Sequence, residues 1–235
     1  MSTTAGSGRG RVGRPRARGP VEDGLSAREG VLAAAAELFT RQGYAATTTR
    51  AIADGAGLRQ ASMYHYFAGK EDILAALLEG TVQPSLDLAR LLLARSEPAE
   101  ARLWALCRAD VELLCGGPHN LGALYLLPET GAERFADFRR VRDELRASYA
   151  ALLAATAAGA ALDGPERQLR SDLVFGLIES VILIRRQTPD RLPAPLADAT
   201  ADGALRLAGA SAQVLAEASA EGAVLLRDLR QPPAI

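Results

Sequence analysis

Residues that carry acid–base, metal or redox chemistry are scarce in this 235-residue chain. It has two histidines and two cysteines. It contains no carboxylate–histidine metal spacing, nucleophile elbow or phosphate-binding loop. We therefore expect no catalytic site, no bound cofactor and no metal, and an α-helical enzyme is only the weaker alternative.

The two cysteines, Cys107 and Cys115, do not suit a disulfide. Eight positions apart on one expected helix, they would lie roughly 12 Å apart. A disulfide needs Cα atoms within about 7 Å, so we expect reduced thiols in a cytoplasmic protein. Cys115 and His119 have a spacing that metal ligands sometimes use, but the glycines and proline between them would break the helix.

Long apolar runs and strand patterns are also missing. The most apolar run, Leu173–Ile184, is twelve residues long and contains Glu179. A bilayer span needs about 20 residues, and no signal peptide is recognisable, so we expect no membrane partner. Gly and Pro punctuate long segments rich in Ala, Leu, Arg and Glu without Val/Ile alternation, which predicts an all-α fold.

Charge is unevenly distributed along the chain. Residues 1–70 carry ten Arg or Lys against five Asp or Glu, although the whole chain has a net charge of −1. Residues 1–22 are Arg-rich and are expected to be a disordered arm. Such an arm either follows DNA phosphates or only solubilises the chain, and the sequence leaves both open.

The segment Thr47–Leu74 has the pattern of two short helices joined by a tight turn. Thr48 suits a helix N-cap, and Gly57 suits the positive φ of the turn. A second helix is expected over 60–66, with Met63 and Phe67 facing inward. This is the helix-turn-helix pattern, whose second helix lies in the DNA major groove.

The residues of this segment resemble the signature of the TetR family of bacterial transcriptional regulators. The resemblance rests on the run from Ala56 to Leu74, which includes Ser62-Met63-Tyr64-His65-Tyr66-Phe67 and Lys70-Glu71, and extends over roughly residues 27 to 78. Two positions depart from the family pattern. Arg59 stands where a small capping residue is usual, and Ala61 stands where Gly is usual. We interpret both as changes in which bases are read.

Arg59 and Gln60 open the expected reading helix. Arginine can bind guanine and glutamine can bind adenine through paired hydrogen bonds, and the surrounding hydroxyls, rings and cations suit phosphate contacts. Lys70 is the only lysine in the chain and opens the next helix. The expected DNA-binding residues are Thr48, Arg50, Arg59, Gln60, Ala61, Ser62, Tyr64, His65, Tyr66 and Lys70.

The apolar periodicity predicts a three-helix DNA-binding head and a larger helical body. The head spans residues 23–83, with helices at 26–42, 48–56 and 60–66 and a linking helix at 70–83. A break at Pro84 would separate it from the body, residues 84–235. The helices expected in the body cover 84–95, 98–115, 120–127, 132–158, 165–187 and one or two segments within 197–230.

The body is expected to dimerise and to bind a small molecule. Residues 173–184 are apolar on nearly every face and so must be covered, and the family resemblance implies a homodimer through helix 165–187 and the one after it. Pockets between helices are mostly apolar with a few polar anchors. The candidate pocket residues are Trp104, Glu112, His119, Tyr125, Phe138, Tyr149, Phe175 and Glu179, with Asp110 as a further polar anchor.

The sequence thus predicts a transcriptional regulator that binds double-stranded operator DNA with sequence choice. By family resemblance it would be a repressor released from a palindromic operator by an effector, although activation stays open. The alternative is a DNA-binding protein without sequence preference that relies on the basic arm. Such a protein would show little discrimination at any salt concentration.

Overall fold

The computed structural model describes residues 25–188 and 193–231, and within these ranges the chain is helical, without strands. The all-α prediction is confirmed. The expected arm, residues 1–22, lies outside the described residues. The elements are α1 (Ala27–Arg41), α2 (Thr49–Gly55), α3 (Gln60–Met63), α4 (Lys70–Leu93), α5 (Ala99–Cys115), the 3₁₀ turns η1 (Leu121–Leu126), η2 (Pro128–Gly131) and η3 (Glu133–Phe135), α6 (Ala136–Ala155), α7 (Ala157–Ala160), α8 (Gly164–Gln187), α9 (Pro193–Ala208) and α10 (Ala212–Arg230).

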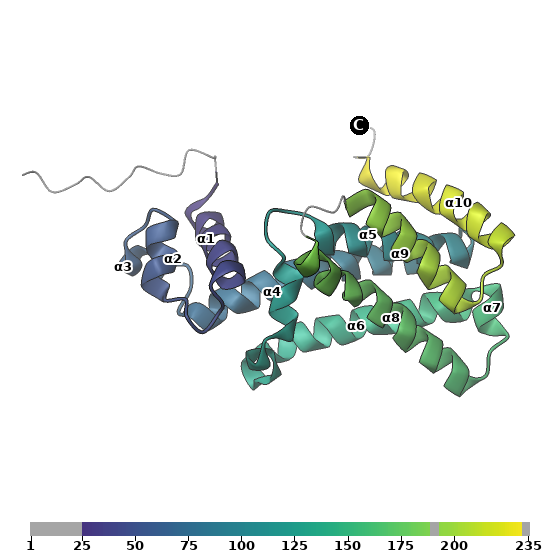
Figure 1. Ribbon diagram of the computed structural model, residues 1–235, viewed down its shortest axis with the longest axis horizontal. Coiled ribbons are helices and arrows are strands. Elements are labelled where there is room, and N and C mark those ends of the chain that lie inside the picture. The colour runs from purple at the N-terminus through teal and green to yellow at the C-terminus, as the bar shows by residue number, and fades with distance from the viewer. Residues whose placement is uncertain (1–24, 189–192, 232–235) are drawn as a thin grey trace, which may run out of the picture.

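Helices α1 to α3 form a small head at one end of the molecule, and α4 runs from it into the body (Figure 1). Ser26 and Glu29 form a capping box that starts α1, which satisfies otherwise free helical N–H groups. Thr48 caps α2 as expected, with its hydroxyl accepting from the Ala51 N–H. Gly57 has φ +68° in the turn that follows, so a residue with a Cβ would be strained there.

The reading helix α3 is shorter than the sequence suggested. It ends at Met63 rather than near Tyr66. After Met63 the chain tightens, because His65 and Tyr66 donate to carbonyls three residues back. Met63 and Phe67 are nonetheless both buried as predicted, so the tighter turn keeps both anchors in the core of the head.

The expected helix break at Pro84 is wrong. Helix α4 continues through Pro84 to Leu93 and joins the two helices expected at 70–83 and 84–95. Proline has no N–H for the carbonyl of Gly80, but Pro84 is itself exposed. Val82, Leu86 and Ala89 bury the other faces on both sides of the proline, and this packing outweighs the lost bond.

The body deviates from the predicted helices in two further places. Residues 121–126 form the 3₁₀ turn η1 rather than an α-helix, and the helix expected over 132–158 is α6 alone. Helix α6 ends at Ala155, and the hydroxyl of the next residue, Thr156, accepts from the Gly159 N–H and caps the start of α7. Gly159 lies in α7 against the Leu153 carbonyl, where an added Cβ would come within 2.0 Å of that oxygen.

The remaining helices follow the predictions closely. Asp163 caps α8, and its carboxylate accepts from the Glu166 N–H. The last helices, expected within 197–230, are α9, which begins earlier at Pro193, and α10, and Gly209 separates them with φ +100°. Helix α5 lies centrally and packs against α4, α6, α8, α9 and α10. Among the described residues, no helix is both long and apolar enough to cross a membrane.

Candidate nucleic-acid interface and ligand pocket

The exposed face of α2 and α3 carries a linked group of polar side chains. Gln60 Nε2 lies 3.0 Å from Thr49 Oγ1 and 3.3 Å from the Tyr64 hydroxyl, and these two oxygens are 3.3 Å apart. Both Gln60 and Tyr64 are exposed. The two helices therefore present Gln60 in a fixed position at the start of α3.

The other expected DNA-binding residues surround this group. Arg59 precedes α3 without a side-chain capping bond, as its replacement of a capping residue predicts. Arg50 is 4.0 Å from Asp54 and largely solvent-exposed, so its guanidinium can turn toward a phosphate. Ala61 and His65 are exposed and Ser62 is half-buried, while Tyr64 and Tyr66 each keep 46 % of their surface exposed.

Lys70 is partly engaged within the head. Its ammonium donates to the Tyr44 carbonyl over 3.0 Å and lies 4.2 Å from the centre of the Tyr44 ring. This contact fixes the start of α4 against the turn before α2. Gly69 precedes α4 without a side-chain cap, so the first N–H groups of α4 and the nearby Lys70 offer a positive end.

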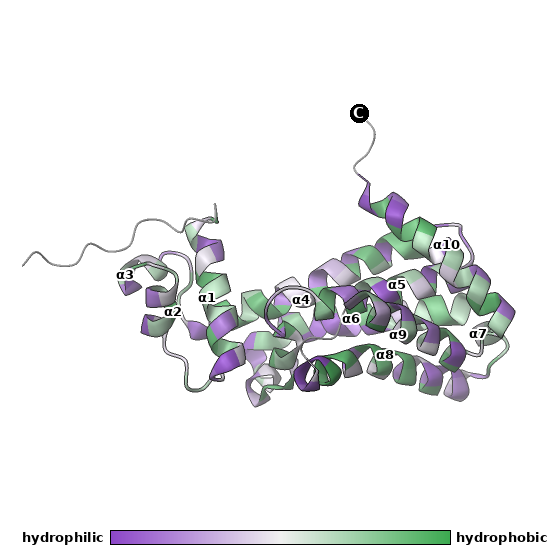
Figure 2. Cartoon of the chain, turned by 45° about the horizontal axis from the view of Figure 1, so that its top comes forward, coloured by the Kyte–Doolittle hydropathy of each residue, from purple (hydrophilic) through white to green (hydrophobic). Residues whose placement is uncertain are grey.

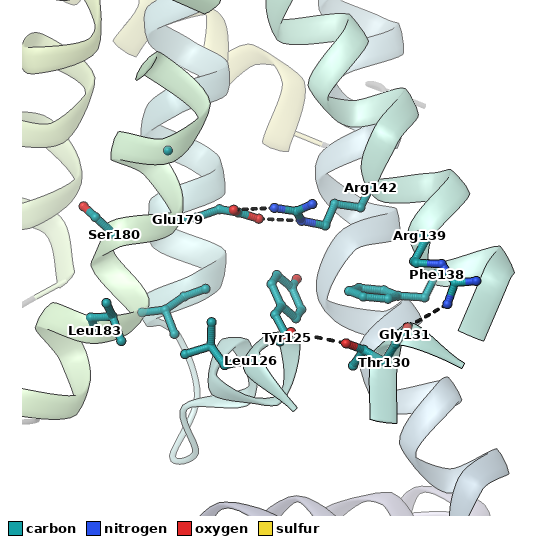
Figure 3. A pocket seen from close by; sticks show the side chains of 12 residues that line it. Tyr125, Leu126, Thr130, Gly131, Phe138, Arg139, Arg142, Glu179, Ser180 and Leu183 are labelled. Carbon is teal, nitrogen blue, oxygen red and sulfur yellow. Dashed lines mark hydrogen bonds and ion pairs between the residues drawn. The ribbon is translucent and has the colours of Figure 1, made fainter. Parts of the chain in front are cut away.

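A body pocket of about 470 Å³ lies between η1, α6 and α8 (Figure 3). Tyr125 and Phe138 pack against each other in it at a tilt of 51°, with ring centres 5.2 Å apart. Glu179 reaches from α8 to Arg142 on α6, at 2.6 Å and 2.5 Å for the two pairs of atoms. The pocket thus combines an aromatic floor with a paired, partly exposed charge. Its lining also includes Leu126, Thr130, Gly131, Arg139, Gly176, Ser180, Ile182 and Leu183.

A buried carboxylate, Asp110, lies between α4, α5 and α6. It accepts from the Ser85 hydroxyl over 2.8 Å and from the Tyr149 hydroxyl over 2.9 Å. The pKa of Asp110 is raised to about 6, chiefly by burial and to a smaller extent by the nearby Glu179, although the two hydroxyl donors lower it. Asp110 therefore links three helices through hydrogen bonds and does not line the body pocket.

The candidate pocket residues are distributed over three places. Tyr125, Phe138 and Glu179 line the body pocket. Glu112 and His119 line a separate hollow beside α1. The other three, Trp104, Tyr149 and Phe175, are buried in the core. The Trp104 indole N–H donates to Asp202 on α9 over 2.9 Å, and Tyr149 meets Phe175 edge to face.

Sequence reasoning missed several residues of both sites. Thr49 was not predicted, because Thr48 already accounted for the N-cap of α2. The hydroxyl of the next residue, Thr49, nevertheless suits the same DNA-facing surface. Arg139 and Arg142 were overlooked because arginines are common in this chain and ordinarily face solvent. Their spacing of three places them on one face of α6, and Glu179 within the apolar run was the signal that a cation lay opposite.

Exposed leucines line α8 and α9. Leu169, Leu173 and Leu183 are each about half exposed, and Leu207 on α9 is 38 % exposed. Along one face of α8, Leu169, Leu173, Gly176, Ser180 and Leu183 follow the spacing i, i+4, i+7, i+11 and i+14. This spacing is typical of a helix that pairs with another helix. The hydropathy colouring shows apolar residues along α8 (Figure 2).

Comparison with known proteins gives consistent matches for this architecture. The family model described as bacterial regulatory proteins, tetR family, matches residues 31–77. The HTH-type transcriptional repressor KstR2 of Rhodococcus jostii is 31 % identical over 143 residues, which cover 58 % of this chain and 70 % of that protein.

Solved structures with the same fold cover most of this chain. The crystal structure of Mycobacterium smegmatis AmtR is 48 % identical, with a TM-score of 0.80, over 92 % of this chain and 100 % of that one. FadR from Bacillus subtilis, solved with stearoyl-CoA, is 22 % identical with a TM-score of 0.62, over 77 % of this chain and 96 % of that chain. The FadR likeness concerns the fold.

Proposed function

Because this chain belongs to the TetR family, it is a DNA-binding transcriptional regulator and not an enzyme, and we propose that it represses its targets as a homodimer on a palindromic operator. The observation that carries the proposal is the Gln60–Thr49–Tyr64 group, exposed at the start of α3 beside Arg59. A dimer would read two half-sites about 34 Å apart.

Specific and general contacts fall to different residues in this proposal. Arg59 and Gln60 read base edges, where each good pair discriminates by about 1–3 kcal/mol. Thr48, Arg50, Ser62, Tyr64, His65, Tyr66 and Lys70 position the head on phosphates, and Ala61 lets α3 approach the groove closely. The bodies, residues 84–235, pair through the seam Leu169–Leu173–Gly176–Ser180–Leu183 and α9.

The body pocket is the effector site in this proposal. Tyr125 and Phe138 supply apolar contact, while Arg142 and Glu179 anchor polar groups of the ligand. Because Glu179 binds Arg142 across the gap between α6 and α8, a ligand that exchanges with this pair changes how the two helices are held. A coupling of about 1–3 kcal/mol to the head would change operator affinity by 5- to 150-fold.

Binding measurements at several salt concentrations test sequence-specific against general DNA binding. Fluorescence anisotropy would measure the affinity of the unaltered chain, of Gln60→Ala and of Lys70→Ala for two duplexes. One is a duplex selected for binding to the unaltered chain, called the bound duplex, and the other is a scrambled version of it. Gln60→Ala should lower the preference for the bound duplex, and Lys70→Ala should weaken both duplexes alike. Equal affinity of the unaltered chain for both duplexes at every salt concentration would instead support the nonspecific alternative.

A further inference from the structure

A second hollow, of about 530 Å³, lies between the head and the body. We name it the head–body hollow. Its walls come from α1, from the middle of α4, from the end of α5 with the turn after it, and from η1. The lining residues are Leu32, Ala33, Ala36, Leu77, Gly80, Thr81, Glu112, Leu113, Leu114, Gly116, Gly117, Pro118, His119, Leu121, Gly122 and Arg185.

Small residues on two of its walls leave space in this hollow. Ala33 and Ala36 lie on the α1 wall beside Leu32, and Gly80 lies on the α4 wall. A Cβ added to Gly80 would meet no atom within 4 Å. The volume falls in the range of about 300–1,000 Å³ that is usual for small-molecule sites.

The charged groups at the rim are already paired within the protein. Glu112 binds Arg108 at 2.6 Å and also binds Arg230. The Arg185 guanidinium donates to the carbonyls of Leu114 and Gly116, each over 2.9 Å, and to the Gly117 carbonyl. A charged ligand would therefore compete with existing pairs, whereas a neutral one would not.

One polar side chain in the lining of the hollow can still hydrogen-bond a ligand. The His119 ring makes no hydrogen bond with any described residue. We propose that the head–body hollow is a second ligand site, which takes a neutral, largely apolar molecule with one group that hydrogen-bonds His119. This site is separate from the body pocket, so the inference does not depend on the effector site proposed above.

The position of the hollow gives such a ligand influence over the head. A ligand there touches α1 and η1 together, and so favours one placement of the head against the body. The hollow adjoins the body pocket. Tyr125, which lines the body pocket, donates a hydrogen bond over 2.8 Å to Thr81, which lines the hollow. An added Cβ on Gly122 would meet Ile182 Cγ1 at 2.7 Å, so η1 has little room to shift unless α8 moves too.

A neutral fluorescent probe tests the site directly. N-phenyl-1-naphthylamine would be titrated into the full chain and into three variants, with circular dichroism and the thermal midpoint as checks of folding. Gly80→Leu fills the hollow from α4, and Ala33→Leu fills it from α1. Gly131→Leu is the matched control, because Gly131 lines the body pocket, lies off the pairing seam, and a Cβ there also meets no atom within 4 Å.

The proposal predicts saturable probe binding that Gly80→Leu and Ala33→Leu each weaken at least tenfold, while Gly131→Leu binds the probe within twofold of the unaltered chain. Wild-type affinity in both folded filling variants would overturn it. So would loss of binding in Gly131→Leu alone, which would assign the probe to the body pocket. Absence of saturable binding to the unaltered chain would overturn it as well.

Discussion

Gln60 is held in place by two hydroxyls before any DNA is bound. Its side-chain amide donates to Thr49 and to the Tyr64 hydroxyl, which restricts the rotamers of a long side chain. Ordering such a side chain on binding costs about 0.5–1.5 kcal/mol. Part of the entropic cost of ordering Gln60 is therefore already incurred when the head folds.

Removing one of the two hydroxyls should weaken operator binding modestly. We expect Tyr64→Phe to lower operator affinity about three- to tenfold, since one restraint on Gln60 and one phosphate-binding hydroxyl are lost. The Gln60→Ala,Tyr64→Phe double variant should lose less than the sum of the single variants, because the two residues act together. Anisotropy titrations of a double-mutant cycle measure this, and strict additivity would contradict the coupling.

Asp110 gives the fold a pH dependence of definite sign. Its pKa of about 6 in the folded chain exceeds the value of about 4 for an unfolded aspartate. Between these values the folded state holds a proton that the unfolded state has released. Stability contributed by Asp110 therefore falls as pH rises from about 4 to 6, and is level above that.

The comparison of wild type with Asp110→Asn isolates this effect. From pH 4 to pH 7, the stability of wild type relative to Asp110→Asn should fall by about 2–3 kcal/mol. Urea unfolding at several pH values measures the difference. A difference that is constant across this range would show that Asp110 does not titrate in it.

At the level of whole elements, α4 is the mechanical connection between head and body. One helix carries Lys70 against the head turn at its start and Ser85 against the buried Asp110 in its middle. We therefore expect a displacement of α5 or α6 around Asp110 to reach the Tyr44 turn of the head through α4. Pro84 lies next to Ser85 and interrupts the helical hydrogen bonds at that point.

Replacing Pro84 by alanine should stabilise the fold. An interior proline costs a helix about 3 kcal/mol, partly offset because proline also restricts the unfolded chain by about 1 kcal/mol. We therefore expect Pro84→Ala to raise the free energy of unfolding by about 2 kcal/mol. Gly80→Ala, one turn earlier, is the control, with an expected gain of about 1 kcal/mol. An unchanged or lowered unfolding free energy for Pro84→Ala would show that the proline fits α4 without cost.

Several elements could be predicted from the sequence, and the failures have physical causes. The capped helices α1 and α2 begin where Ser26 and Thr48 indicated, because capping is local chemistry, and α8 begins at Gly164, next to the expected start at 165. The continuity of α4 could not be predicted, since it depends on the burial of Val82 and Leu86 against distant helices. η1 could not be predicted for the same reason. Its short apolar sequence is compatible with an α-helix, but its conformation depends on the packing of Gly122 against Ile182 of α8.

The candidate sites divide along the same line. The proposed DNA-binding residues come from one contiguous segment, so their placement together around α2 and α3 follows from local structure. The pocket residues come from separate helices, and their grouping is a property of packing. Only three of the eight candidates, Tyr125, Phe138 and Glu179, line the body pocket, because Trp104, Tyr149 and Phe175 are used in the core.

At the scale of the whole molecule, one head reads too few bases to select a site, so the proposed function requires a dimer. The exposed leucines of α8 and α9 are the surface that we propose for it. Two half-sites bound together multiply the discrimination of one head. Weakening the pairing of the bodies should therefore weaken operator binding without touching the reading residues.

A charge placed in the seam tests this requirement. Leu173→Glu should shift the chain toward monomer in analytical ultracentrifugation and lower operator affinity more than tenfold, because it buries charge in the pairing surface. Leu91→Glu is the matched control, since Leu91 on α4 is similarly exposed, at 56 % against 49 % for Leu173, but lies off the seam. Equal behaviour of the two variants would exclude α8 as the dimer interface.

The measurement that tests the account most directly is selection of bound fragments from random duplex DNA by the purified chain, at a salt concentration of about 150 mM. The account predicts an enriched palindrome whose half-sites lie about one helical turn, or a multiple of it, apart. It also predicts that Gln60→Ala relaxes the preference at one symmetric pair of positions. Binding without any enriched sequence, and loss of that binding as salt rises, would contradict sequence-specific regulation by a dimer.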